Sequence, residues 1–201
     1  MQITIKAVGT KPLLLHNVDL ANPLNPWARK MADLRGTPSK RRTEKWHEEM
    51  AYANFMGAFY DIPGVDGIAI PAENLRRSLI DAAKASRLGT QVQRALMVTI
   101  AAVPLIYDGP KTAQKMWDAG TWHLTRMIRG AGGASPTTYP IFHNWAVRAP
   151  YELDESLLNI RDLTEIAERA GRIEGLGASR KQGYGRYDAL IESDKLPSRT
   201  S

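Results

Sequence analysis

The sequence predicts an α+β fold of the ferredoxin-like (RRM-like) type, in which two helices cover one face of an antiparallel sheet. Stretches typical of strands occur at residues 2–9, 95–107 and 186–192. Apolar residues recur at helical spacing in residues 72–87 and 159–174. Apart from an insertion after the first strand, the expected order is therefore strand, helix, strand, strand, helix, strand.

The first strand and the insertion after it account for the N-terminal third of the chain. Residues 2–9, QITIKAVG, alternate polar and apolar side chains, as a half-buried strand does. A loop rich in proline and asparagine follows, and a short helix is expected from Trp27 to Leu34. Residues 36–42, GTPSKRR, lack hydrophobic side chains, which predicts an exposed loop, with disorder as an open alternative.

A second helix of the insertion is expected to begin after Thr43, which is a suitable N-cap, and to run to about Tyr60. Its inward side is predicted to carry Trp46, Met50, Ala53 and either Phe55 or Gly57. Residues 19–61 are thus interpreted as a helical insertion.

The middle of the chain combines one helix with several strands. Pro71 suits the first position of a helix over residues 72–87, whose inward residues are Leu75, Leu79, Ala82 and Ala83, and Arg77 and Asp81 are spaced for an i, i+4 ion pair. Two short strands are expected within residues 95–107, followed by an alternating strand over 121–129.

A long hairpin is expected next, with its glycine-rich tip at residues 129–140. The sequence from Gly130 to Pro140, GAGGASPTTYP, is predicted to be irregular, and a strand is expected from Ile141 to about Leu153.

The C-terminal part is predicted to contain a helix, a glycine-rich loop and a strand. Asn159 caps the helix, which runs to about Glu174 with an apolar stripe that extends to Ile173. The last strand covers 186–192, and residues 194–201 form a polar, flexible tail. A single domain over residues 1–193 is the simplest organisation for this length.

The glycine-rich loop from Ile173 to Tyr187, IEGLGASRKQGYGRY, is the first candidate for a phosphate contact. Its glycines allow a ligand to approach the backbone, its cations suit phosphates, and Tyr184 or Tyr187 can stack on a base. For Tyr187, which lies on an alternating strand, a place in the core is favoured over stacking. The candidate contact residues of the loop are Gly177, Arg180, Lys181, Gly183, Tyr184, Gly185 and Arg186. The loop lacks the spacing of an ATP phosphate loop and follows a helix, which excludes a dinucleotide fingerprint.

Composition favours a polyanionic partner. The chain has 27 Lys and Arg against 21 Asp and Glu, with a formal charge of +6 and a pI of about 9.6. Further candidate nucleic-acid contacts are Lys40, Arg41, Arg42, Arg76 and Arg129. The sequence contains no cysteine, and nothing in it resembles a signal peptide or a membrane span, so a cytoplasmic protein is expected.

The histidines show no metal-binding spacing, and neither a metal nor a cofactor is predicted. His16, beside Asn17, is the one weak candidate for a catalytic base. Most of the five tryptophans are expected in the core or in a subunit interface.

Two motifs resemble the RAMP superfamily, the ferredoxin-like RNA-binding proteins that form the backbone of CRISPR effector complexes. Residues 70–80, IPAENLRRSLI, resemble the strand-to-helix entry of that superfamily, and residues 175–186, GLGASRKQGYGR, resemble its C-terminal glycine-rich loop. Separately, residues 15–17, LHN, and 21–26, ANPLNP, resemble a signature of uncharacterised proteins of tailed bacteriophages and prophages. Glu73 and Arg77 depart from the superfamily pattern, which has small residues or lysine there.

The resemblance implies a non-enzymatic, phage-encoded protein of the host-cell cytoplasm that binds single-stranded RNA or DNA and oligomerises along the strand. Arg180, Lys181 and Arg186 would contact phosphates, and the hairpin from Gly130 to Tyr139 would reach a neighbouring subunit. Two alternatives remain open. One is a metal-independent endoribonuclease that uses His16, and the other is a protein-interaction module that mimics a CRISPR subunit and blocks its assembly.

Overall fold

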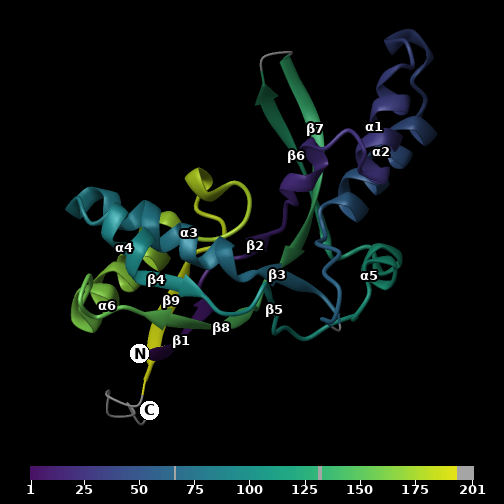
Figure 1. Ribbon diagram of the computed structural model, residues 1–201. Helices are drawn as coiled ribbons and strands as arrows, with labels where there is room; N and C mark the ends of the chain where they lie inside the picture. Colours follow the sequence, from purple (N-terminus) through teal and green to yellow (C-terminus); the bar gives the residue numbers. More distant parts are fainter. Residues whose placement is uncertain (66, 131–132, 194–201) are drawn as a thin grey trace. The chain divides into compact units, whose positions relative to one another are not determined.

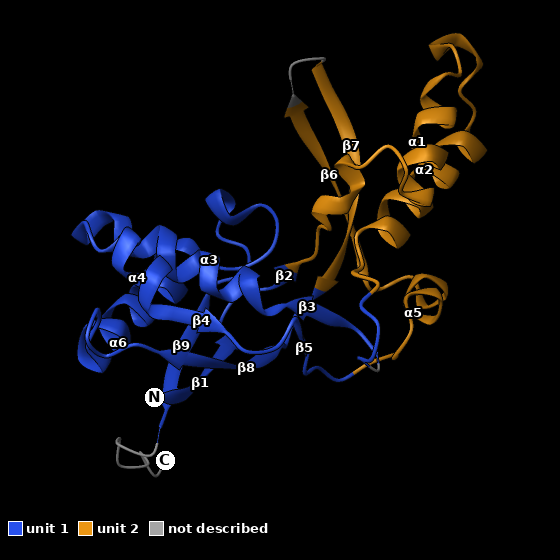
Figure 2. Cartoon of the chain, in the orientation of Figure 1, with its two compact units in different colours: residues 1–13, 62–108, 142–201 blue, residues 14–61, 109–141 orange. Residues whose placement is uncertain are grey.

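The structure, a computed structural model, describes residues 1–65, 67–130 and 133–193 and divides into two compact units. Unit 1 comprises residues 1–13, 62–108 and 142 onward, and unit 2 comprises residues 14–61 and 109–141 (Figure 2). A single domain over residues 1–193 stays a prediction. The expected tail at 194–201 and residues 131–132 of the expected hairpin tip lie outside the described residues.

Unit 1 is built on a four-stranded sheet in the order β4-β8-β1-β9, in which all neighbours are antiparallel (Figure 1). Its strands are β1 (Gln2–Gly9), β4 (Leu96–Val98), β8 (Ala146–Leu153) and β9 (Tyr187–Glu192). Ile5 of β1 lies opposite Ala149 on one side and Ile191 on the other. A separate pair joins β3 (Ala69–Pro71) to β5 (Ala102–Pro104).

One face of this sheet is buried, and the residues of β1 alternate between buried and half-exposed as the sequence predicts. Ile3, Ile5 and Ala7 are buried, whereas Thr4 and Lys6 between them are half-exposed. Helix α3 follows β1 and precedes β4, helix α6 connects β8 to β9, and the two helices pack against each other. The predicted α+β class is confirmed, and these strands and helices follow the predicted order.

The helical segments of unit 1 agree with the sequence in position but differ in detail. They are α3 (Ala72–Ala83), η3 (Lys84–Ser86), α4 (Gly89–Ala95), α6 (Ile160–Arg169), the π-helical turn η4 (Ala170–Glu174) and η5 (Arg180–Gln182). Asn159 caps α6 as predicted, since its Oδ1 accepts from the Asp162 amide at 2.8 Å. The predicted stripe is wrong at Ile173, which is 45% exposed because the chain leaves α-helical geometry after Arg169. Helix α4 was not expected.

Unit 2 contains the helical insertion and a three-stranded sheet in the order β2-β7-β6. Its helical segments are η1 (Val18–Ala21), α1 (Pro26–Arg35), η2 (Ser39–Arg41), α2 (Glu44–Gly57) and α5 (Ala113–Ala119), and its strands are β2 (Leu13–Leu14), β6 (His123–Gly130) and β7 (Gly133–Phe142). Thr43 caps α2 as predicted, with Oγ1 accepting from the Trp46 amide at 3.4 Å. Helix α5 was not expected, and Ser39–Arg41 form a helical turn rather than a disordered loop.

Aromatic side chains form the centre of unit 2. Tyr52 and Phe55 of α2 lie 5.2 and 5.3 Å from Trp117 of α5, centroid to centroid, and His123 of β6 stacks on Trp117 at 4.9 Å. Trp27 of α1 adds an edge contact to Tyr52 at 5.8 Å. These contacts place two of the five tryptophans in the packing of unit 2, as the sequence predicts.

The hairpin differs from the prediction. Residues 133–142 form the regular strand β7, and the stretch expected as one strand from Ile141 to Leu153 is interrupted by a turn before β8. The amide of Ile141 donates to Trp122 O at 3.0 Å, so the odd-numbered residues of β7 direct their amides toward β6. Pro136 and Pro140 direct their nitrogens the opposite way, where a proline removes no bond to β6.

Candidate nucleic-acid interface

The glycine-rich loop belongs to unit 1 and is closed by backbone hydrogen bonds. Leu176 N donates to Gly185 O at 2.8 Å, which joins the two ends of the loop, and Gly175 N donates to Ala170 O at 2.8 Å. Gly185 N donates to Pro12 O at 2.7 Å, so the segment that follows β1 lies beside the loop. This contact brings a basic segment from the N-terminal part of the chain to the candidate site.

Two of the loop glycines are required by the close approach of these backbones. A Cβ at Gly185 would lie 1.9 Å from Leu176 O, and one at Gly175 would lie 2.8 Å from Gly185 O. Both residues also have a positive φ, at 68° and 72°. Gly183 has a φ of 88°, but a Cβ there would meet no atom within 4 Å. Gly175 and Gly185 therefore close the loop, whereas Gly183 turns it in open space, and Gly177 also has a positive φ, at 72°.

Arg186 and Arg180 are engaged within unit 1. The guanidinium of Arg186 donates to the carbonyl oxygens of Ile173 and Arg180, and its own carbonyl accepts from the Thr10 amide at 2.8 Å. Arg180 lies 3.7 Å from a carboxylate oxygen of Asp81. Both side chains thus hold the loop in place with the groups that were expected to contact phosphate.

Asp81 is the carboxylate to which the loop is anchored. Burial acts to raise the pKa of Asp81, but the hydrogen bond from Lys84 and the charges of Arg77, Lys84 and Arg180 together lower the pKa below its ordinary value. Lys84 Nζ lies 2.7 Å and Arg77 Nε 3.3 Å from Asp81 Oδ1, which confirms the predicted pair of Arg77 and Asp81. The carboxylate therefore stays ionised and holds α3 to the loop at neutral pH.

A pocket of about 570 Å³ lies at the loop, and the region has three exposed cations. Lys11 and Arg172 line the pocket together with Arg186, and Lys181 is exposed on the loop itself. The carboxylates of Glu168 and Asp188 also line it. Sequence reasoning missed Lys11 and Arg172. Arg172 stands three residues before the first loop glycine, a position that could have indicated it, whereas Lys11 reaches the loop only through the fold.

The two tyrosines of this region have different surroundings. Tyr187 is 2% exposed, its Oη lies 3.1 Å from Ser78 Oγ, and burial raises its pKa, so it is a core residue as predicted. Tyr184 is half-buried on the loop. A side chain in this position leaves part of its ring accessible.

Arg76 of α3 is bound to neighbouring groups by all three guanidinium nitrogens. Nε donates to Leu96 O at 2.6 Å, Nη1 donates to the Glu73 carboxylate at 2.8 Å, and Nη2 donates to Gln93 O. The side chain is only 16% exposed. Arg76 therefore connects α3 to α4 and β4.

The remaining predicted contacts belong to unit 2, whereas the loop belongs to unit 1. Lys40 and Arg41 lie on η2, Arg42 follows them, and Arg129 is exposed on β6 close to the end of the strand. The structure therefore assembles the loop residues in unit 1 and does not join all predicted contacts in one unit.

His16 lies in unit 2 near β7. Its ring makes an edge contact with Tyr139, with centroids 6.0 Å apart, and its backbone carbonyl accepts from Tyr60 Oη at 2.8 Å. Burial of part of the ring lowers the pKa of His16, which favours the neutral imidazole. No group of three or more His, Asp or Glu side chains in the described ranges could hold a metal ion.

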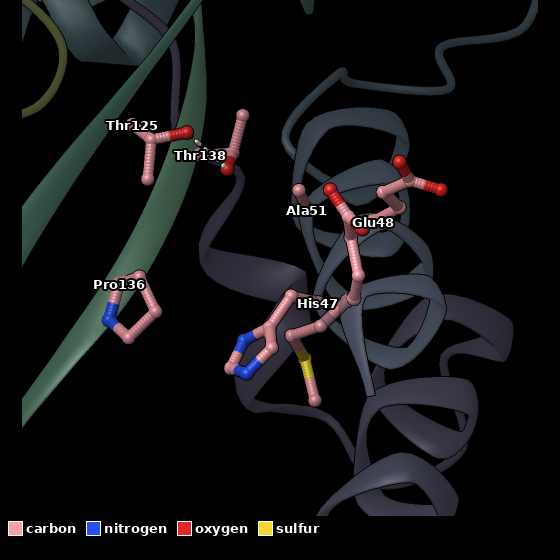
Figure 3. Close-up of a pocket in the computed structure, with 8 residues that line it drawn as sticks. His47, Glu48, Ala51, Thr125, Pro136 and Thr138 are labelled. Carbon is pink, nitrogen blue, oxygen red and sulfur yellow. Dashed lines mark hydrogen bonds between the residues drawn. The ribbon is translucent and has the colours of Figure 1, made fainter. Parts of the chain in front are cut away.

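A second pocket, of about 300 Å³, lies between α2 and the β6–β7 hairpin in unit 2 (Figure 3). Glu44, His47 and Glu48 line it from the helix, and Thr125 and Thr138, whose hydroxyls lie 2.8 Å apart, line it from the strands. Its two carboxylates disfavour a phosphate ligand.

Comparison with known proteins finds similarity to solved structures only. No family model and no curated protein sequence matches the chain. The chain is similar to the crystal structure of Cmr6 from Pyrococcus furiosus, with a TM-score of 0.37 and 12% sequence identity over 94% of this chain and 98% of that one. A TM-score of this size does not establish a common fold. None of the helices in the described part of the chain is long and apolar enough to span a membrane.

Proposed function

We propose that the chain binds the phosphate backbone of single-stranded nucleic acid at the glycine-rich loop of unit 1. The observation that carries this proposal is the pair of exposed cations, Lys11 and Arg172, that line the pocket at the closed loop, together with Lys181, which is exposed on the loop itself. Exposed ammonium and guanidinium groups gain affinity by releasing the counterions of a nucleic acid. The formal charge of +6 supports a polyanionic ligand.

Within this proposal the cations of the site have two roles. Arg180 and Arg186 position the loop through Asp81 and through backbone carbonyls, and the three exposed cations contact phosphates. The accessible part of Tyr184 offers one surface on which a base can stack. Binding of this kind tolerates many sequences, because phosphate contacts carry no sequence information.

We also propose that subunits line up along the strand. The β6–β7 hairpin of unit 2 is the candidate contact with a neighbouring subunit, and its exposed side chains include Met127 on β6, which is 63% exposed. Phage origin and cytoplasmic location remain expectations from the sequence.

The test is the salt dependence of binding, measured by fluorescence polarisation with a labelled single-stranded RNA and the matching DNA. The variant with Lys11→Ala, Arg172→Ala and Lys181→Ala should lower the slope of log affinity against log salt by about 2, since each phosphate contact on a single strand contributes about 0.7. A matched control replaces the exposed cations Arg94, Lys115 and Arg161 by alanine and thereby removes the same charge.

The proposal fails if the wild-type protein does not bind either oligonucleotide at low salt. It also fails if the site variant and the control variant have equal affinities and slopes, because net charge alone would then explain binding. The ratio of absorbance at 260 and 280 nm of the purified protein, before and after nuclease treatment, tests whether nucleic acid copurifies.

A further inference from the structure

The connection between α1 and α2 in unit 2 concentrates positive charge at one end of a helical pair (Figure 1). We define residues 35–45 as the basic tip. It contains one carboxylate, that of Glu44, and five exposed cations, which are Arg35, Lys40, Arg41, Arg42 and Lys45. Charge of one sign at this density favours an anionic ligand.

The basic tip is ordered by one of its own arginines. Arg42 Nε donates to Thr37 O at 3.1 Å, and Arg42 Nη2 donates to Arg35 O at 3.5 Å. The guanidinium lies over the ring of Trp46, 4.5 Å from its centroid. Trp46 in turn donates from Nε1 to Leu34 O at 2.8 Å, which ties α2 to the end of α1. Arg42 therefore stabilises the turn through hydrogen bonds and a cation–π contact.

Lys40 and Arg41 differ from Arg42 in exposure and in the partners of their side chains. Both are exposed on η2, and neither takes part in an ion pair within the described residues. The turn holds them in place, since Arg41 N donates to Pro38 O at 2.8 Å and Arg42 N donates to Ser39 O at 3.2 Å. Two cations on an ordered turn lose less conformational freedom on binding than the same cations on a disordered loop.

The surroundings favour phosphate at the tip rather than along α2. Glu44 at the end of the tip and Glu48 on the next turn of α2 both line the pocket between α2 and the β6–β7 hairpin, and so add negative charge along the helix (Figure 3). Lys45 Nζ lies 4.0 Å from a carboxylate oxygen of Glu49, and this ion pair makes Lys45 less available to a phosphate. Within the described part of the tip, positive charge without an ion pair thus remains on Arg35 at the end of α1 and on Lys40 and Arg41, which are adjacent in the sequence on the turn η2.

We propose that Lys40 and Arg41 form a second contact with the phosphate backbone of single-stranded nucleic acid, and that Arg42 supports this contact by holding the turn. This inference rests on the proposed function, because it takes the ligand class from there. It adds a binding surface that is separate from the glycine-rich loop and belongs to the helical insertion of unit 2.

The experiment compares the double variant Lys40→Ala/Arg41→Ala with the control Lys115→Ala/Arg161→Ala, which removes equal charge from exposed positions elsewhere. In the fluorescence polarisation assay, the tip variant should lower the salt slope by about 1.4, from two phosphate contacts at about 0.7 each. The midpoint of thermal unfolding should be unchanged in the tip variant and lowered in Arg42→Ala. A tip variant with the affinity and slope of its control overturns the inference.

The outcomes separate the inference from the proposed function. Lack of binding by the wild type defeats both. Loss of binding in the loop variant, with a tip variant equal to its control, overturns the tip contact alone, and the reverse result supports the tip while overturning the loop. A tip that is required for binding to vesicles containing phosphatidylserine, but not for binding to the oligonucleotides, also overturns the inference.

Discussion

Replacement of Gly185 by alanine tests whether the glycine-rich loop is held by close backbone approach. The new Cβ would lie 1.9 Å from Leu176 O, so one of the two backbone segments, at Leu176 or at Gly185, must move. That movement breaks or weakens the bonds from Leu176 N to Gly185 O and from Gly185 N to Pro12 O. Each such bond contributes about 0.5 to 1.5 kcal/mol to stability.

A second contribution comes from backbone conformation. Gly185 has a φ of 68°, and a residue with a Cβ in this region is destabilised by about 1 to 2 kcal/mol. Together with the two hydrogen bonds, the expected loss in free energy of unfolding is about 2 to 5 kcal/mol. Gly183 has a φ of 88°, and a Cβ added there would have no atom within 4 Å. Its replacement by alanine should therefore show only the backbone contribution of about 1 to 2 kcal/mol.

Urea denaturation of the wild type, Gly185→Ala and Gly183→Ala measures the difference directly. Both substitutions reduce the freedom of the unfolded chain in the same way, so this effect cancels between the two variants. We expect Gly185→Ala to be the less stable by about 1 to 3 kcal/mol, the sum of the two hydrogen bonds. Equal stability of the two alanine variants would refute the reasoning, because the close approach would then have no energetic consequence.

Three further predictions concern single side chains. Arg76→Ala should lower the free energy of unfolding by about 1.5 to 3 kcal/mol in urea denaturation, because it leaves carbonyls and Glu73 without their charged donor, and should leave the salt slope of binding unchanged. Since the pKa of Asp81 is lower in the folded state than its ordinary value of 3.8, its contribution to stability is present above that value and lost as the pH falls through the folded pKa. Urea denaturation in acid should therefore show a smaller loss of stability for Asp81→Asn than for the wild type, and parallel pH profiles would contradict this. Labelled RNA should remain intact with the wild type and with His16→Ala, whereas cleavage that is lost in the variant would support the endoribonuclease alternative.

The sequence predicts the elements that carry a local signal. Asn159 and Thr43 were expected to cap helices and do so, because the amides they bond lie within three residues. The strand β7 was missed because Pro136 and Pro140 normally indicate irregular structure, and their tolerance depends on which side of β7 the partner strand lies. That side is a property of the sheet, and a single segment does not encode it.

The same distinction between local and non-local information applies to the candidate site. Arg186 and Lys181 are equally basic members of one loop, yet the first donates to backbone carbonyls and the second is exposed. Arg42 and Arg41 are adjacent in the sequence, and only Arg42 lies over Trp46. In both places an arginine orders a turn by donating hydrogen bonds to carbonyl groups, and a neighbouring cation is exposed. A basic run therefore contains cations that bind groups of the chain itself and cations that are exposed, and only the hydrogen-bond partners of each side chain distinguish the two kinds.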